Sequence, residues 1–86
     1  MDRQQMTLSL VRVLQEWDPF EVGSENYEPE IADAVLAVSD IEDVQSLARR
    51  LKEIYEFSFD EPLDFQACLA VAEKLIMIRT NTSCTL

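Results

Sequence analysis

The densest group of side chains that could do chemistry lies between Trp17 and Asp33, in the stretch WDPFEVGSENYEPEIAD. Its acidic residues, with no lysine or arginine among them, are Asp18, Glu21, Glu25, Glu28, Glu30 and Asp33. Such a group could bind a hard cation, supply an acid–base pair, or attract a basic partner. Each of these chemistries requires a different arrangement of neighbouring residues.

The spacing does not fit a calcium-binding EF-hand loop. If Gly23 held the sixth position of such a loop, Asp18 would be first, and the third, fifth and twelfth positions would be Phe20, Val22 and Pro29. None of these three side chains carries an oxygen ligand. We therefore expect no metal site, and a carboxylate-based divalent-ion binder is the alternative.

The composition also disfavours catalysis. The chain has no histidine, which removes the commonest general base, the usual zinc ligand and the partner of a serine or cysteine nucleophile. Because Gly23 is the only glycine, a glycine-rich phosphate loop is absent. We expect a protein that is not an enzyme and uses no cofactor. A small enzyme built on paired carboxylates is the alternative from another functional class.

Apolar residues recur with helical periodicity in four segments. The predicted helices cover residues 3–17, a segment from Tyr27 or Glu28 to the turn at 39–43, residues 43–58 and residues 64–79. Asp18-Pro19 should end the first helix, because a residue before proline avoids the helical region. Asp40 or Asp43 should cap the third helix, and Asp64 the fourth.

These helices predict an all-α fold. One glycine and three prolines argue against a turn-rich β fold, and short connections favour antiparallel neighbours. We expect a compact antiparallel four-helix bundle, made irregular by a short second helix. Residues 1–79 should form a single helical domain, and residues 80–86 a frayed C-terminal tail.

Charge, hydropathy and cysteine content limit the classes of binding partner and the cellular compartment that we expect. The net charge is −10, which disfavours binding to nucleic acid and to anionic membranes. The N-terminus lacks the apolar block of a signal peptide, and no apolar run approaches the length that spans a bilayer, so we expect a cytoplasmic protein. Cys68 and Cys84 have no metal-binding spacing and should be reduced, with Cys68 in the core.

The negative charges are unevenly distributed. Ten carboxylates and no cation lie between Arg12 and Arg49. One interpretation is a solvated face with carboxylates at helix starts; the other is a docking surface for a basic protein patch. The residues predicted to make that electrostatic contact are Asp18, Glu21, Glu25, Glu28, Glu30 and Asp33.

Some apolar residues could either belong to the core or contact a partner. Trp17, Phe20 and Tyr27 either fold back over the ends of the first two helices or serve as partner anchors. Val71 and Ile78 lie to one flank of the fourth helix, where they could support self-association.

The motifs of this chain resemble a known family. The matching positions run from Trp17-Asp18-Pro19, Gly23, Tyr27, Glu30-Ile31, Asp33 and Val35 to Leu47-Ala48 and the run Ile54-Tyr55-Glu56-Phe57-Ser58-Phe59. They are similar to the YugE-like family of small bacterial proteins of unknown function, over residues 3–79. The resemblance implies a small all-helical bacterial domain, with no assigned activity and no catalytic residues to carry over.

A looser similarity concerns Trp17-Asp18-Pro19 followed by Tyr27, Glu30 and Ile31. This pattern resembles immunity proteins that accompany bacterial toxins. It implies, as an alternative function, an inhibitor that neutralises a basic toxin or nuclease.

Overall fold

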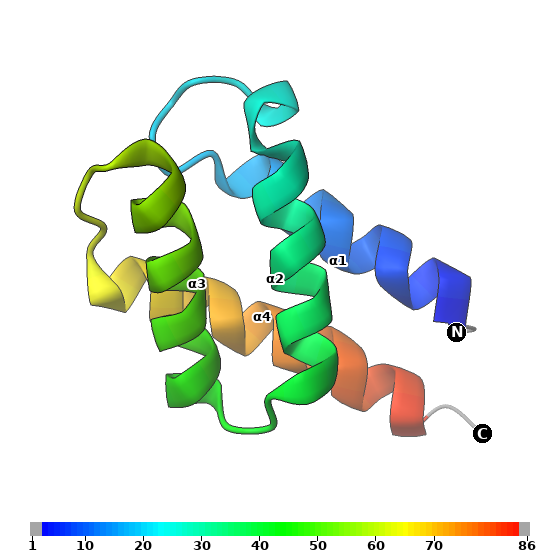
Figure 1. Ribbon diagram of the computed structural model, residues 1–86. Helices are drawn as coiled ribbons and strands as arrows, with labels where there is room; N and C mark the ends of the chain where they lie inside the picture. The colour runs from blue at the N-terminus through cyan, green and yellow to red at the C-terminus, as the bar shows by residue number, and fades with distance from the viewer. Residues whose placement is uncertain (1–2, 85–86) are drawn as a thin grey trace.

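The computed structural model describes residues 3–84, without the side chains of residues 3, 24, 25 and 81–84. The elements along the chain are α1 (Arg3–Trp17), a short 3₁₀ helix η1 (Ser24–Tyr27), α2 (Glu28–Asp40), α3 (Val44–Phe59) and α4 (Phe65–Cys84) (Figure 1). The described residues contain no strand. The predicted all-α fold with four helices is confirmed, and α2 is the shortest of the four as expected.

The helices form two antiparallel pairs that cross steeply. Helices α2 and α3 make a hairpin through residues 41–43, and this hairpin lies across α1 and α4 (Figure 1). The structure therefore builds the predicted bundle from one pair that is local in sequence and one pair from the two ends of the chain.

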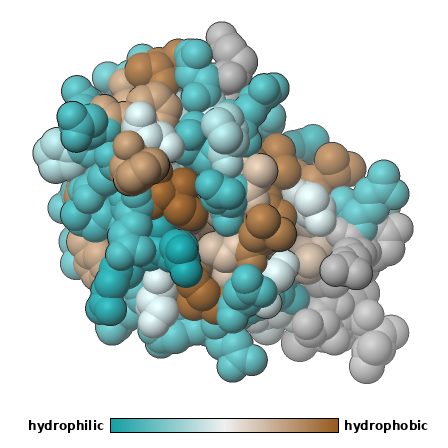
Figure 2. All heavy atoms as spheres, viewed as in Figure 1, coloured by the Kyte–Doolittle hydropathy of each residue, from teal (hydrophilic) through white to brown (hydrophobic). Residues whose placement is uncertain are grey.

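The face of the molecule shown in Figure 2 is mostly hydrophilic, and hydrophobic patches interrupt it. The large apolar side chains with the greatest exposure among the described residues are Leu8, Val22, Leu36, Phe57 and Met77. Single exposed apolar residues are ordinary on protein surfaces and do not by themselves mark a functional site.

Local signals fix the helix starts as predicted. Pro29 lies in the first turn of α2, where its missing N–H is harmless. Asp43 caps α3, because its Oδ2 accepts a hydrogen bond of 2.8 Å from the Ser46 N–H. Asp64 does the same for α4, with 3.2 Å between its Oδ2 and the Ala67 nitrogen.

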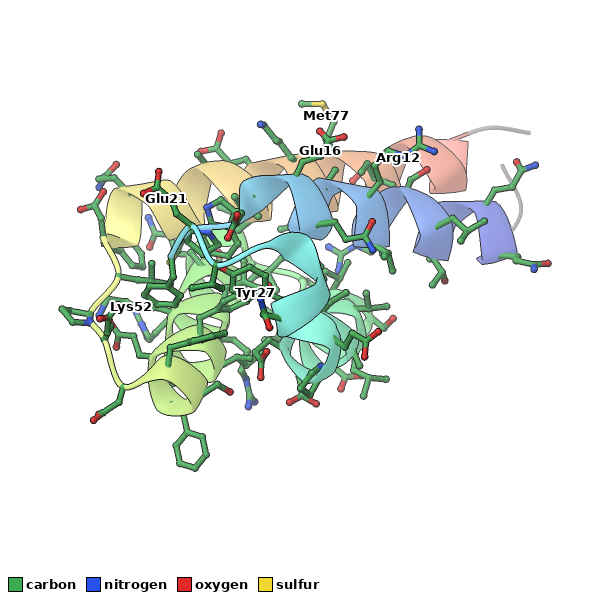
Figure 3. All side chains as sticks on the ribbon, turned by 90° about the horizontal axis from the view of Figure 1, so that it is seen from above. Arg12, Glu16, Glu21, Tyr27, Lys52 and Met77 are labelled. Atoms are coloured by element: carbon green, nitrogen blue, oxygen red, sulfur yellow. The ribbon has the colours of Figure 1, made fainter. Side chains whose placement is uncertain are left out.

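Helix α4 is longer than predicted. It lies side by side with α1, in the opposite direction (Figure 3), and stays helical to Cys84 rather than ending at residue 79. The apolar periodicity stops near residue 79, but residues 80–84 contain no glycine or proline that would end the backbone helix. The predicted tail at 80–86 lies largely outside the described side chains.

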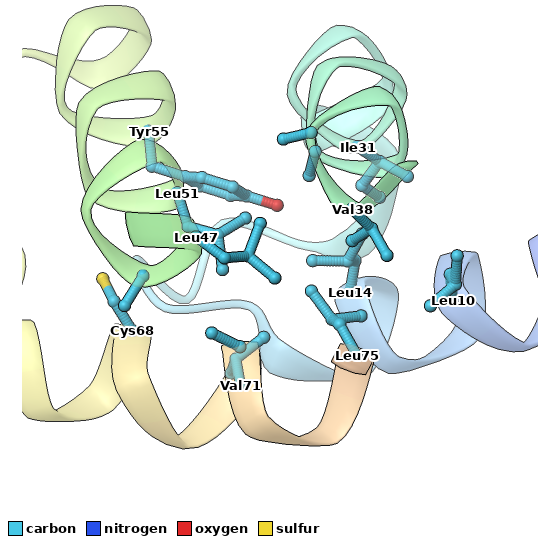
Figure 4. Close-up of a cluster of buried hydrophobic side chains, with 14 of the residues drawn as sticks. Leu10, Leu14, Ile31, Val38, Leu47, Leu51, Tyr55, Cys68, Val71 and Leu75 are labelled. Carbon is cyan, nitrogen blue, oxygen red and sulfur yellow. The ribbon is translucent and has the colours of Figure 1, made fainter. Parts of the chain in front are cut away.

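One core fills the space between the two helix pairs (Figure 4). Its fully buried leucines are Leu10 and Leu14 from α1, Leu47 and Leu51 from α3, and Leu75 from α4. Cys68 is buried as predicted, and burial raises the pKa of its thiol to about 11. Val71, placed with Ile78 on a flank of the fourth helix that could support self-association, is only 6% exposed and belongs to the core, and Ile78 packs against that core.

Arg79 ties α4 to the end of α2. Its guanidinium donates hydrogen bonds to the carbonyl oxygens of Val38 and of Ile41, the latter at 2.7 Å. The last carbonyls of a helix have no intrahelical partner, so this side chain satisfies groups that would otherwise need water. No helix of the described residues is long and apolar enough to cross a membrane.

Candidate functional site

The acidic connection between α1 and α2 is organised around the pair Asp18 and Tyr27. The Tyr27 hydroxyl donates a hydrogen bond of 2.6 Å to Asp18 Oδ1 and accepts one of 3.0 Å from the Phe20 N–H. The Asp18 carboxylate also accepts the Val22 N–H at 2.9 Å and the Gly23 N–H at 3.2 Å. Asp18 therefore holds the connection together from within.

The two partners shift each other's protonation. The hydrogen bond from Tyr27 is the main reason that the pKa of Asp18 lies below its usual value, since it stabilises the carboxylate. Burial, followed by the hydrogen bond to Asp18, raises the pKa of Tyr27 to about 12. At neutral pH the pair is thus a neutral phenol bound to a carboxylate.

The backbone of the connection makes two unusual turns at non-glycine residues. The φ angles are 34° at Asp18 and 56° at Glu21, and Gly23 has a φ of 97°. Positive φ is uncommon outside glycine, although aspartate tolerates it better than most residues. The Asp18 hydrogen bonds offset this strain, and the only glycine of the chain stands where it is needed.

The aromatic residues of the connection fold back onto the helices, as one of the two interpretations predicted. Trp17 packs edge-on against Tyr55, and Phe20 packs against Phe59, each with ring centroids 4.9 Å apart. Tyr27 lies between them, 5.5 Å from Tyr55 and 5.2 Å from Phe59. The surface they cover is the C-terminal half of α3 rather than the ends of α1 and α2.

The six acidic residues predicted as a partner surface do not form one exposed cluster. The Asp18 carboxylate is engaged inside the connection, and Glu30 is only 6% exposed. Glu21, Glu28 and Asp33 are exposed, while the side chain of Glu25 lies outside the described residues. Only the exposed three remain candidates among the described side chains.

The burial of Glu30 had a signal in the sequence. Glu30 follows Tyr27 by three residues and precedes Ala34 by four, so it lies on the buried stripe of α2. Across the core, the Tyr55 hydroxyl points from α3 towards α2 (Figure 4) and has no hydrogen-bond partner among the described residues. Burial, with a smaller contribution from the charge of Glu30, raises the pKa of Tyr55.

A groove lies between α1 and α2. Its volume is about 740 Å³ and it is open to solvent. The residues lining it are Thr7, Val11 and Gln15 from α1 and Glu28, Ile31, Ala32, Val35 and Leu36 from α2. Most of this lining is apolar, so the groove suits a hydrophobic group rather than an ion.

Leu36 forms a ridge beside this groove. Its side chain is 64% exposed, and it also borders a smaller hollow of about 330 Å³ between α2 and α3. Asp33 and Asp40 line that second hollow from α2, and Arg50 lines it from α3. The two aspartates lie three residues before and four after Leu36, which puts all three on one face of α2. The sequence carried a signal for this surface, because Leu36 lies between two aspartates on a polar face of the predicted helix. The sequence-based prediction did not use it.

The site offers no evident means of holding a metal. Among the described residues, no three acidic, cysteine or histidine side chains lie close enough together to bind an ion. The arrangement combines an apolar groove with separate exposed carboxylates.

Comparison with known proteins identifies the family. Residues 9–85 match the family model described as "Domain of unknown function (DUF1871)". The chain belongs to the DUF1871 family. It is 36% identical to the uncharacterized protein YugE of Bacillus subtilis (strain 168) over 85 residues, which cover 99% of each protein. The predicted resemblance to YugE-like proteins is thereby confirmed.

A crystal structure supports the DUF1871 fold. A protein from Bacillus stearothermophilus that is 39% identical superposes with a TM-score of 0.89, covering 92% of this chain and 98% of that one. Neither the family description nor the name of the relative assigns an activity. Function must therefore be inferred from the surface described above.

Proposed function

We propose that this DUF1871 protein is a cytoplasmic protein–protein interaction module without catalytic activity, which binds a basic surface of another protein along α2. The observation that carries the proposal is the set of exposed carboxylates on α2, with Glu28 on the side of the α1–α2 groove and Asp33 and Asp40 beside Leu36 on the side of α3. Among the described residues none of these three carboxylates makes an ion pair, although Arg50 of α3 lines the same hollow as Asp33 and Asp40.

The charge balance supports this proposal. The chain carries 17 acidic and 7 basic residues, and such an excess destabilises the compact state through self-repulsion. A basic partner would relieve that repulsion. Carboxylates at the rim of an interface chiefly accelerate association, and their effect decays over a Debye length of about 8 Å at physiological salt. A basic toxin or nuclease is one class of partner that would fit.

The test is capture from a Bacillus subtilis lysate at low and moderate salt. The chain would be compared with a triple variant, Glu28→Lys, Asp33→Lys and Asp40→Lys. A matched control, Glu53→Lys, Glu61→Lys and Glu73→Lys, reverses three exposed carboxylates elsewhere and has the same net charge. Circular dichroism would establish that all three proteins are folded.

We expect a basic protein to be retained by the wild type and the control, to be lost by the α2 variant, and to be released by moderate salt. Equal retention by all three proteins would contradict the role of α2. Equal loss from both variants would show a non-specific charge effect, and an empty wild-type lane would also count against the proposal.

A further inference from the structure

The groove between α1 and α2 has the dimensions of a helix-binding site. Along α2 its lining runs from Glu28 to Leu36, nine residues separated by eight helical rises, which corresponds to roughly 12 Å, or about two helical turns. Ala32 lies midway, and its small side chain leaves room above the helix axis. Two turns of a partner helix would present apolar side chains at positions i, i+3 or i+4, and i+7 to this space.

The openness of the groove argues against a small-molecule ligand. Small-molecule sites usually bury most of the ligand surface within a walled cleft. Here the groove is open to solvent, with Val11, Ile31 and Val35 among its apolar lining residues. An elongated partner that covers the groove from above would bury this apolar surface more completely.

Charge identifies the kind of partner. Glu28 lines one end of the groove, and Asp33 is exposed beyond Leu36, where it lines the hollow between α2 and α3 together with Arg50. A second copy of this chain, with a net charge of −10, would bring like charges together. A helix carrying lysine or arginine beside its apolar face would bring opposite charges to the same positions.

We propose that the α1–α2 groove binds an amphipathic basic helix of a partner protein. The apolar side chains of that helix enter the groove over Ala32, and its cations lie near Glu28 and Asp33. This inference rests on the proposed function and adds to it the secondary structure and the polarity of the segment that is bound.

The probe is a fluorescein-labelled synthetic peptide of leucine and lysine, with leucines at helical i, i+3, i+4 and i+7 spacing. Binding at low salt would be followed by fluorescence polarisation and located by amide chemical-shift changes. A peptide of the same composition in scrambled order has the charge without the apolar face. A third peptide with glutamate in place of lysine has the apolar face without the positive charge.

Two variants of the protein block the groove, each with a matched control. Ala32→Trp fills the groove, and Ala70→Trp places the same side chain at an exposed alanine of α4. Leu36→Glu removes the apolar ridge, and Leu8→Glu changes a leucine of α1 that is 62% exposed, against 64% for Leu36. We expect Ala32→Trp and Leu36→Glu to weaken binding by about tenfold or more, and the controls to change it little.

The inference would be overturned if the amphipathic peptide did not bind, if the scrambled peptide bound equally well, or if chemical shifts changed away from α1 and α2. Dimerisation of the wild type that Ala32→Trp abolishes would instead make a second copy the occupant. If Ala32→Trp still captured the partner that the α2 charge variant loses, the groove inference would fail while the proposed function would stand. If the wild type showed no charge-dependent capture at all, both the groove inference and the proposed function would fail.

Discussion

Tyr27 donates its hydroxyl proton to the carboxylate of Asp18 across 2.6 Å, and this contact fixes the connection between α1 and α2. The same carboxylate accepts two backbone N–H groups, from Val22 and Gly23. Asp18, which the sequence analysis assigned to a partner surface, therefore stabilises the connection itself.

Replacing Tyr27 with phenylalanine should destabilise the fold. The substitution removes the hydrogen bond to Asp18 and leaves the Phe20 N–H without its acceptor, at a cost of about 1–3 kcal/mol. Urea unfolding followed by circular dichroism would measure the change in the free energy of unfolding. An unchanged midpoint would mean that water replaces the hydroxyl at no cost.

Replacing Tyr55 with phenylalanine should have the opposite effect, although both tyrosines are fully buried. The Tyr55 hydroxyl has no hydrogen-bond partner among the described residues, so its removal relieves a desolvation penalty. We expect a free energy of unfolding that is unchanged or higher by about 1 kcal/mol. A loss as large as that of Tyr27→Phe would show that the Tyr55 hydroxyl has a partner, such as a buried water.

Alkaline pH should destabilise the protein through Tyr27. The pKa of Tyr27 is about 12 when folded, compared with an ordinary value of 10.0, so the unfolded chain releases this proton first. The associated stability is complete below pH 10 and is lost as the pH rises towards 12. Tyr55, whose pKa is also raised, acts in the same direction.

Urea titrations between about pH 9 and 11 should show the free energy of unfolding falling as the pH rises. The slope should be shallower in Tyr27→Phe than in the wild type. Lys52 and Cys68, whose pKa values are also raised, act in the same direction in this range, so the assignment to Tyr27 rests on the difference between the wild type and Tyr27→Phe. An identical slope in the wild type and Tyr27→Phe would contradict the assignment to this phenol.

Substitution of Arg79 by methionine should loosen the junction between α4 and the end of α2. The guanidinium donates to the carbonyls of Val38 and Ile41, and charge-assisted hydrogen bonds of this kind contribute about 1.5–3 kcal/mol. Arg12→Met, at an exposed arginine of α1, is the control. Faster amide exchange at the C-terminal end of α2 in Arg79→Met alone would locate the effect, and equal exchange in both variants would contradict it.

Elements that depend on neighbours in sequence could be predicted well. The bounds of α1, the proline in the first turn of α2 and the caps at Asp43 and Asp64 all follow from local rules of helix geometry. The Lys52–Glu56 ion pair, with 2.7 Å between nitrogen and oxygen, is likewise a local i, i+4 contact. These features need no knowledge of how the helices pack.

Contacts, burial and the groove depend on how the helices pack, and they could not be predicted from local rules. Arg79 meets carbonyls that precede it by 41 and 38 residues, and no periodicity links these positions. Glu30 was assigned to a partner surface because it is charged, whereas its place on the stripe of α2 puts it inside. The groove exists only because α1 packs beside α2, so its lining could not be recognised from either helix alone.

The pairing of α1 with α4 has a consequence for how the protein folds. Helices α2 and α3 are joined by residues 41–43, whereas residues 18–64 separate α1 from α4. Closing the longer segment costs more chain entropy, and contacts distant in sequence form more slowly. The α2–α3 hairpin should therefore form early, with α1 closing onto α4 at the end. A truncating substitution at Leu10 of α1 should then mainly speed unfolding, while one at Leu47 of α3 should mainly slow refolding.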